Sequence, residues 1–198
     1  MTVTAKSESV FYWNQRQECM PRDQLEQHQL QMLREQLAHV CERSPFYRRK
    51  LDAAGIRPID IHSMDDVRGI PFTEKEELRL SQANHPPWGD FGCIAPKEAV
   101  RVFQTSGTTG RPVRIMISRK DWHETFYEQF MHFRCGFGLT EHDVLFVPFN
   151  YGLYIAWWSF QTTMEKAGLM IIPGGGLSSK DRLRAMLVQG LVEGKEIS

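Results

Sequence analysis

The sequence lacks closely spaced cysteines. It has four, and none forms a Cys-x-x-Cys pair: Cys19, Cys41, Cys93 and Cys135. This spacing argues against a zinc knuckle and against a dense disulfide framework, so we expect reduced thiols. Cys135 lies beside a run of aromatic residues, where a buried small hydrophobic residue is favoured over a nucleophile.

An excess of charge of either sign is also missing, because 24 Lys and Arg balance 24 Asp and Glu. The composition therefore gives no reason to expect nucleic acid or an anionic membrane as a partner. No apolar run approaches the roughly 20 residues of a membrane span, and residues 1–10 have no apolar core of signal-peptide length. We expect a cytoplasmic protein without a membrane partner, in which any anion site is local.

A metal-binding cluster is not indicated. His28 and His39 share one side of a predicted amphipathic helix over residues 23–43. No carboxylate or cysteine is clearly aimed at them, which favours solvated or core-edge histidines over metal ligands. With 198 residues, 41% of them hydrophobic, the chain can form one domain with a real core or two small ones.

The stretch around which the chain is organised is a turn rich in glycine and hydroxyl side chains between apolar runs at residues 100–103 and 113–117. Two extended segments joined by such a turn are typical of a hairpin that binds phosphate, because glycine lets backbone N–H groups converge on an anion. The turn contains two glycines, Gly107 and Gly110, and one cation, Arg111. Its hydroxyl donors are Thr105, Ser106, Thr108 and Thr109. A hydroxyl-rich turn without a ligand is the alternative.

Two common phosphate-binding motifs do not fit this turn. No Lys-Ser or Lys-Thr pair follows Gly110, and a strand comes next, so it is not a Walker A loop. A third glycine and a following helix are also missing, which excludes a dinucleotide fingerprint.

The N-terminal half reads as short capped helices. The helix at residues 23–43 carries apolar residues three and four apart, namely Leu30, Leu33, Leu37, Val40 and Cys41. Ser44 is the N-cap of a second, short helix that starts at Pro45, and Gly55 ends this short helix. A capped turn at residues 63–66, a capping box at residues 73–76 and a loop at residues 81–98 follow. Before them, aromatic residues anchor an N-terminal arm: Phe11, Tyr12 and Trp13.

The C-terminal half reads as strand, helix, strand. A capped helix ending near Phe137 carries an aromatic stripe that we expect to be buried, consisting of Trp122, Phe126, Phe130 and Phe133. A buried strand at residues 144–149, a helix at 153–166 and a strand at 169–173 then predict a βαβ unit of a parallel sheet. Ser178 caps a last helix ending near Gln189.

The carboxyl ends of these strands indicate a ligand site. In open α/β sheets ligands bind outside the carboxyl ends of the strands, which places residues 149–151 and 173–176 along one rim. The aromatic residues Tyr151, Tyr154 and Trp157 would suit a flat or aliphatic acid. An ordinary aromatic core is the alternative for Tyr154 and Trp157.

The string Ser106-Gly107-Thr108-Thr109-Gly110-Arg111-Pro112 resembles the phosphate-binding loop of adenylate-forming (AMP-binding) enzymes. Ser44-Pro45-Phe46-Tyr47-Arg48, Asn150-Tyr151-Gly152-Leu153, Gly168 and residues 171–176 resemble the phenylacetate-CoA ligase branch. The resemblance runs from about Tyr12 to about Leu187 and covers less than half of such an enzyme. It implies an α/β fold: a helical N-terminal region, a phosphate-loop β-hairpin and βαβ units of a parallel sheet, as part of a larger adenylate-forming N-terminal domain.

The resemblance also implies a division of the chain. Residues 1–99 would be an N-terminal helical region with a linker loop, and residues 100–198 part of an AMP-binding α/β subdomain carrying the phosphate loop. The C-terminal domain of the family would be absent.

The implied reaction is ATP-dependent ligation of a carboxylic acid to coenzyme A. The acid and ATP give an acyl-adenylate and pyrophosphate, and the adenylate then gives acyl-CoA and AMP, with an aryl acid such as phenylacetate as the expected substrate. The resemblance implies ATP, Mg²⁺ and coenzyme A, and allows a homodimer of the full-length enzyme. It gives residues 105–111 the phosphate role, with Arg111 where the family usually has lysine. It gives the acid-binding role to Tyr151 and Gly152, and less directly to Leu153 and Tyr154.

No catalytic residue is assigned in this chain. In the family the catalytic lysine, the acidic Mg²⁺ ligand and the adenine-binding motifs follow the point where this chain ends, and residues 190–198 depart from the pattern. We therefore expect a fragment that is inactive alone. Two alternatives remain: a non-catalytic module that binds a nucleotide or a partner, and a transferase of the same branch that passes the acyl or adenylyl group to another acceptor.

Overall fold

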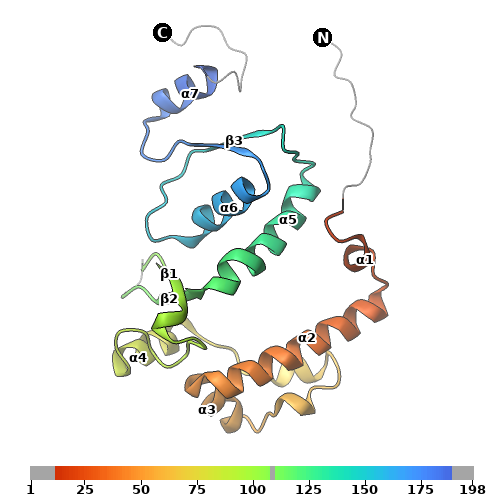
Figure 1. Ribbon diagram of the computed structural model, residues 1–198. Helices are drawn as coiled ribbons and strands as arrows, with labels where there is room; N and C mark the ends of the chain where they lie inside the picture. Colours follow the sequence, from red (N-terminus) through yellow and green to blue (C-terminus); the bar gives the residue numbers. More distant parts are fainter. Residues whose placement is uncertain (1–11, 108–109, 189–198) are drawn as a thin grey trace. The chain divides into compact units, whose positions relative to one another are not determined.

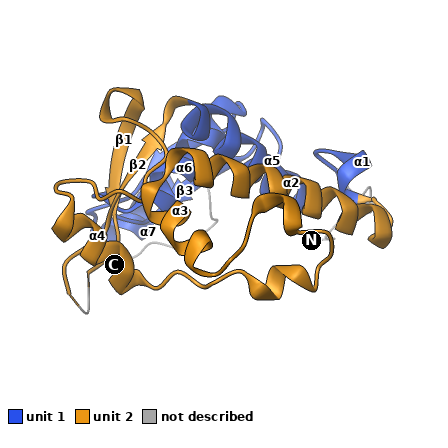
Figure 2. Ribbon diagram, turned by 90° about the horizontal axis from the view of Figure 1, so that it is seen from below, with its two compact units in different colours: residues 1–18, 120–198 blue, residues 19–119 orange. Residues whose placement is uncertain are grey.

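The computed structural model describes residues 12–107 and 110–188 (Figure 1). They form two compact units, which Figure 2 shows in different colours. One unit comprises residues 19–119, and the described part of the other comprises residues 12–18 and 120–188. The predicted hairpin thus lies in the unit that also contains the N-terminal helices.

Helices α2 (Arg22–Arg43) and α3 (Pro45–Ala53) build the core of the unit at residues 19–119. The helix predicted at residues 23–43 is confirmed, together with its apolar face. The buried residues of this core are Leu30, Leu37, Leu51 and Ile61. Partly buried apolar residues pack around them, namely Leu33, Val40, Cys41, Ile56, Val67 and Ile70. Short 3₁₀ turns complete the region at Pro58–Asp60 and Asp66–Gly69.

The predicted stop and start signals around α3 are confirmed. The Ser44 hydroxyl accepts a hydrogen bond from the Tyr47 amide at 3.2 Å, and Pro45 occupies the first helical position. Gly55, just beyond the helix, has φ of 67°, a left-handed conformation that favours glycine. The capped turn at residues 63–66 is also present, because the Asp66 carboxylate accepts from the amide and hydroxyl of Ser63 at 2.8 and 2.9 Å.

Helix α4 (Lys75–Asn84) differs from the prediction at both ends. The predicted capping box at residues 73–76 is wrong by one residue, since the Glu74 amide donates to the Glu77 carboxylate at 2.7 Å. The loop predicted to start at residue 81 begins only after Asn84, because Ser81 and Gln82 are buried and hydrogen-bonded to neighbouring segments. A 3₁₀ turn, Pro96–Glu98, precedes the hairpin.

Strands β1 (Ala99–Gln104) and β2 (Arg114–Ser118) pair antiparallel at the two apolar runs. Phe103 lies opposite Ile115, and the register shifts between Ala99 and Arg101. Phe103 and Ile117 are buried, so one face of the pair packs inward.

The second unit contains the strand–helix–strand segment. It consists of β3 (Val144–Val147), α6 (Ile155–Lys166) and β4 (Met170–Pro173), and β3 pairs parallel with β4. Helix α7 (Ser179–Val188) follows, with the Ser178 hydroxyl accepting from the Asp181 amide at 3.2 Å, as predicted. Gln189, where this helix was expected to end, lies outside the described residues.

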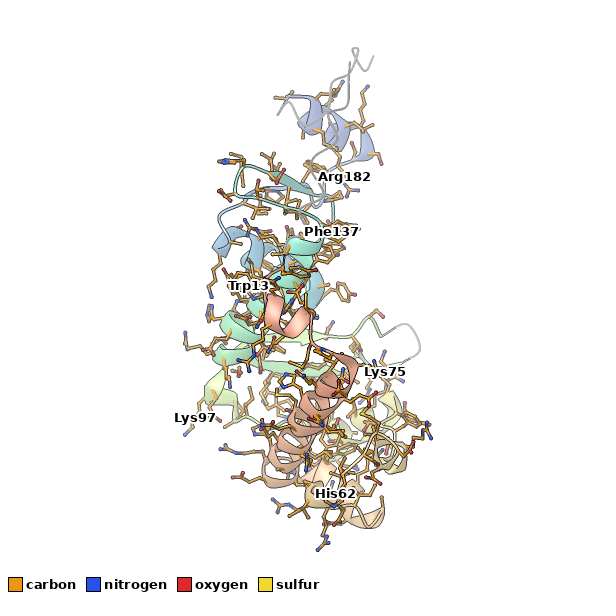
Figure 3. The ribbon with its side chains drawn as sticks, turned by 90° about the vertical axis from the view of Figure 1, so that its right-hand side faces the viewer. Trp13, His62, Lys75, Lys97, Phe137 and Arg182 are labelled. Carbon is orange, nitrogen blue, oxygen red and sulfur yellow. The ribbon has the colours of Figure 1, made fainter. Side chains whose placement is uncertain are left out.

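The arm before residue 19 belongs to the second unit. Trp13 precedes the short helix α1 (Gln15–Glu18), and its indole N–H donates to the Glu128 carboxylate of α5 (Phe126–Gly136) at 2.7 Å (Figure 3). The Trp13 ring also meets Tyr127 edge to face at 5.9 Å. Trp13 is therefore the predicted aromatic anchor, while Phe11 lies outside the described residues.

The aromatic stripe predicted on α5 is only partly buried. A π-helical turn, η4 (Asp121–Thr125), precedes α5 and uses more residues per turn, which rotates the residues that follow it. Trp122 is buried, but Phe133 is 44% exposed, so the expectation that it is buried is wrong. Met131 and Cys135 face the core instead, and Cys135 is confirmed as a buried small residue.

The continuous burial expected for the strand at residues 144–149 is also wrong. Strand β3 ends at Val147, the residue of this strand that is fully buried, while its other residues are half-buried. Phe149 is exposed beyond the strand. In the described part of the chain β3 has β4 as its paired strand, and this two-stranded sheet leaves more of its surface open than a wider sheet would.

Candidate functional site

The turn between β1 and β2 is closed by two hydrogen bonds at its mouth. The Thr105 amide donates to the Val113 carbonyl at 3.0 Å. In return, the Val113 amide donates to the Thr105 hydroxyl, also at 3.0 Å. The Thr105 side chain thus serves the hairpin itself, by accepting from the backbone of the opposite strand.

Glycine is required at residue 107. Its φ is 65°, and a Cβ built there would lie 2.9 Å from Cγ of Pro112. Its carbonyl accepts from the Gly110 amide at 3.2 Å. Ser106, Gly110 and Arg111 are exposed around it. The other two predicted residues of the turn, Thr108 and Thr109, lie outside the described residues.

Helix α4 supports the turn from within the same unit (Figure 1). The Arg79 Nε donates to the Arg111 carbonyl at 2.9 Å, and a Cβ built on Gly110 would lie 3.2 Å from the guanidinium carbon of Arg79. Gln82 pairs with the backbone of Arg114, donating to its carbonyl at 2.7 Å and accepting from its amide at 3.2 Å. Thus α4 holds the exit of the turn and the first residue of β2.

Sequence reasoning missed both of these residues. Arg79 and Gln82 occur in a helix rich in charged and polar residues, where they look like ordinary solvated side chains. The one signal in the sequence was their separation by three positions, which places them near each other on the surface of a helix.

The surroundings of the turn are positively charged. Arg79, Arg111 and Arg114 line one pocket of about 70 Å³, together with Gln82. A larger pocket of about 240 Å³ adjoins Gly110 and is lined by Glu76, Arg79 and Arg111, among others. The carboxylate of Glu76 lies 3.0 Å from Nη1 of Arg79. Guanidinium groups beside an exposed glycine turn are a favourable environment for a phosphate anion.

The second predicted site lies in the other compact unit, where the carboxyl ends of β3 and β4 meet. The Gly174 amide donates to the Val147 carbonyl at 2.8 Å. A Cβ built on Gly175 would lie 2.4 Å from the Phe149 carbonyl oxygen, so the two segments are in close contact. The expectation that residues 149–151 and 173–176 share one edge agrees with these contacts.

Tyr151 turns inward at this edge. Its ring meets Trp158 at 4.9 Å, and its hydroxyl is buried without a hydrogen-bond partner among the described residues. Burial, and to a lesser degree the negative charge of Glu165, raises the pKa of Tyr151 above its usual value, so the phenol is neutral. A neutral buried hydroxyl of this kind is suited to hydrogen-bond a polar group of a ligand.

The other residues predicted for the acid site, Gly152, Leu153 and Tyr154, are exposed, unlike the Tyr151 hydroxyl. Leu153 and Tyr154 are each 54% exposed, and the Gly152 carbonyl accepts from the Trp158 indole at 2.9 Å. The ring of Phe149 stacks on Trp157, with centroids 3.8 Å apart. Tyr151 and Gly152 thus share a contact with Trp158, while Leu153 and Tyr154 lie at the surface.

Neither a metal cluster nor a membrane helix emerges from the part of the chain that the structure describes. Within residues 12–107 and 110–188, no group of three or more His, Cys, Asp or Glu side chains is arranged to hold a metal ion. Over the same ranges no helix has the length and apolar character needed to span a bilayer.

Comparison with known proteins relates most of the chain to one group of enzymes, although no protein-family model matches it. The chain is 33% identical over 173 residues to the phenylacetate-coenzyme A ligase of Thermus thermophilus and 32% identical over 159 residues to that of Escherichia coli. These matches cover 87% and 80% of the chain. The chain is a homologue of the phenylacetate-coenzyme A ligases.

Solved structures agree with this relationship to the ligases. A crystal structure of 2-hydroxyisobutyryl-CoA ligase in complex with 2-HIB-AMP and CoA matches 94% of the chain at 33% identity, with a TM-score of 0.81. The chain spans 37% of the length of the Thermus ligase and 39% of the 2-hydroxyisobutyryl-CoA ligase. It therefore corresponds to a part of such an adenylate-forming ligase.

Proposed function

We propose that this chain is the N-terminal portion of an ATP-dependent carboxylic acid-CoA ligase. Such an enzyme joins the acid to the α-phosphorus of ATP with loss of pyrophosphate, and then transfers the acyl group from the adenylate to the thiol of coenzyme A. The observation that carries the proposal is the exposed, glycine-dependent turn flanked by arginines, in a chain about a third identical to acid-CoA ligases.

The role proposed for residues 105–111 is to hold the β- and γ-phosphates. Exposed Ser106 offers a hydroxyl, Gly107 and Gly110 let the backbone approach an anion, and Arg111 offers a positive charge. Negative charge accumulates on the departing pyrophosphate, and donors that are already oriented stabilise it without reorganisation. Thr108 and Thr109 share this proposed role by their place in the motif.

The described residues do not fit a Mg²⁺ site by themselves. Mg²⁺ prefers carboxylate and phosphate oxygens. Glu76, which lines the pocket beside the turn, is paired with Arg79, and no metal cluster occurs within the described ranges. Mg²⁺ would enter as the counter-ion of ATP.

The role proposed for Tyr151 and Gly152 is to bind the acid, with Leu153 and Tyr154 at the mouth of that site. The unpartnered Tyr151 hydroxyl and the stacked rings of Phe149 and Trp157 support an aryl acid. Phenylacetate, the acid in the names of the relatives, is the first to test. A cytoplasmic location, a homodimer of the full-length enzyme and inactivity of the chain alone remain predictions.

Pyrophosphate exchange tests the proposal. The chain, and separately the chain joined to the sequence that follows it in its gene, are incubated with ATP, Mg²⁺, labelled pyrophosphate and a panel of aryl and fatty acids. We expect acid-dependent incorporation of label into ATP by the longer polypeptide, strongest with an aryl acid. In the longer polypeptide, Ser106→Ala should lower the rate, and Ser63→Ala, at an exposed turn in the same unit, should leave it unchanged.

The outcomes separate the alternatives. Exchange by the longer polypeptide, with no acyl-CoA formed when coenzyme A is then added, would identify a transferase that uses another acyl acceptor. No exchange by either polypeptide with any acid, while ATP still binds, would contradict the ligase proposal in favour of a nucleotide-binding module.

A further inference from the structure

Arg79 contacts the turn in two ways. Its Nε donates to the Arg111 carbonyl at 2.9 Å, which fixes the backbone where the chain leaves the turn. Its guanidinium carbon and terminal nitrogens would lie 3.2 to 3.4 Å from a Cβ at Gly110, so the planar group lies against the glycine backbone. The Arg79 side chain is 15% exposed, and its charge is therefore held close to the turn.

Glu76 opposes that charge. It lies one helical turn before Arg79 on α4, and its carboxylate is 3.0 Å from Nη1 of Arg79 while 63% exposed. Glu76, Arg79, Gly110 and Arg111 line the same pocket of about 240 Å³. An anion entering this pocket would be attracted by the two arginines and repelled by Glu76.

We infer that Arg79 is a positioning residue for polyphosphate binding at the turn and that Glu76 is the counter-charge that moderates it. This inference rests on the phosphate role proposed above for the turn. Arg79 holds the Arg111 carbonyl and adds positive charge beside Gly110, so it favours an anion such as pyrophosphate or the phosphate chain of ATP. Glu76 keeps the guanidinium oriented but cancels part of its charge.

The arrangement needs arginine rather than lysine. One nitrogen of the guanidinium donates to a backbone carbonyl while another faces a carboxylate, and the planar fork fixes the angle between them. Lysine carries the same charge on a single nitrogen and cannot make both contacts in this geometry. Charge and positioning can therefore be separated by substitution.

The experiment is titration calorimetry of inorganic pyrophosphate into the full chain at neutral pH and low salt. We expect Arg79→Gln to weaken binding by about tenfold, the loss of one charge-assisted hydrogen-bonding group. Arg79→Lys should weaken it by about threefold, because the charge stays and the fork is lost. Glu76→Gln should tighten it by about twofold, because a repulsive charge is removed.

Matched controls lie in the same compact unit. Arg57→Gln breaks an exposed ion pair with Asp60 that also spans three residues, and Glu35→Gln removes a carboxylate exposed on α2. Neither control should change pyrophosphate affinity beyond the electrostatic effect of one distant charge. Thermal unfolding of every variant shows whether it is folded at the temperature of the titration.

The outcomes distinguish this inference from the proposed function. If the unsubstituted chain binds no pyrophosphate, the phosphate role of the turn is wrong and the inference fails with it. If it binds and Arg79→Gln binds equally well, the inference alone is overturned. Wild-type affinity in Arg79→Lys would contradict positioning by the fork. The Glu76→Gln side chain can still accept a hydrogen bond from Arg79 but carries no negative charge, so unchanged or weaker binding in this variant would contradict the role of counter-charge.

Discussion

Gly107 lies at a position where the backbone leaves no room for a side chain. Its left-handed φ of 65° and the nearby ring of Pro112 both require glycine. The conformation of the turn therefore depends on glycine at this position, whereas the side chains of Ser106 and Arg111 are exposed.

Replacing Gly107 by alanine is expected to lower the free energy of unfolding by about 1–3 kcal/mol, because alanine must adopt a strained conformation against Pro112. Urea denaturation followed by circular dichroism measures the change. The control is Gly136→Ala at the end of α5, where a Cβ would meet nothing within 4 Å. We expect no loss of stability in this control. The expectation would be contradicted if Gly107→Ala also left the free energy of unfolding unchanged.

Asp90 joins α3 to α4 through its side chain. The carboxylate accepts from the Ser81 hydroxyl at 2.7 Å and from the Arg49 guanidinium at 2.6 Å, and His85 lies 3.7 Å away. Partial burial alone would raise the pKa of Asp90, but these hydrogen bonds and the nearby positive charges outweigh it. The net pKa is below the usual value.

The pH dependence of stability follows from that sign. A carboxylate with a lowered pKa in the folded state stabilises the fold above its unfolded pKa of about 3.9, and this is lost as pH falls through the folded-state pKa. We expect the unfolding free energy to drop below about pH 4, and Asp90→Asn to be less stable at pH 7 with a shallower acid decline. Asp65→Asn, at an exposed ion pair, is the control and should keep the steep decline. Equal slopes in wild type and Asp90→Asn would contradict the linkage.

At the scale of elements, α4 does more than cover the hairpin. Its last turn carries the buried Gln82, whose side chain makes both backbone hydrogen bonds of Arg114 that a neighbouring strand would otherwise make. The same side-chain amide also donates to the Trp88 carbonyl at 3.3 Å. One side chain therefore links α4, the following loop and β2.

Truncating Gln82 to alanine should lower the free energy of unfolding by about 1–3 kcal/mol, because backbone groups at the start of β2 lose their partner. The control is Gln31→Ala on α2, whose side chain bonds the exposed Glu35, and we expect a change within about 0.5 kcal/mol. Denaturant unfolding compares the two. Similar losses in both variants would argue against a supporting role for α4.

At the scale of the whole molecule, each compact unit has its own buried residues. Leu37 belongs to the core of the unit at residues 19–119, and Met164 is fully buried on α6 in the other unit. Cores that share no residues allow separate local unfolding.

We expect Leu37→Ala, at a cost of about 2–5 kcal/mol, to reduce amide hydrogen-exchange protection in α2 and α3 while α5 and α6 keep theirs. Met164→Ala is the reciprocal variant and should affect α5 and α6 alone. Mass spectrometry of peptides from each unit reports the protection. Loss of protection in both units by either variant would show that they unfold together.

The predictions that succeeded rest on local chemistry. The apolar spacing of Leu30 and Leu37, the Ser44-Pro45 cap and the extended runs on either side of the turn each determine a nearby element. The exposed Phe133 and the longer α4 could not be foreseen, because a π-helical turn and contacts from distant segments decide them. In the candidate site, Tyr151 was named from its motif and its acid-binding role stays a prediction, while the contacts of Arg79 were not foreseen.

The amino-acid sequence by itself determined the order of helices and strands, the glycine turn and the relationship to acid-CoA ligases, because periodicity, caps and short motifs act over a few residues. Tertiary structure alone decided which polar side chains support that turn. Arg79 and Gln82 are more than 30 positions away from the backbone groups they bind, and only folding brings such separated groups within hydrogen-bonding distance.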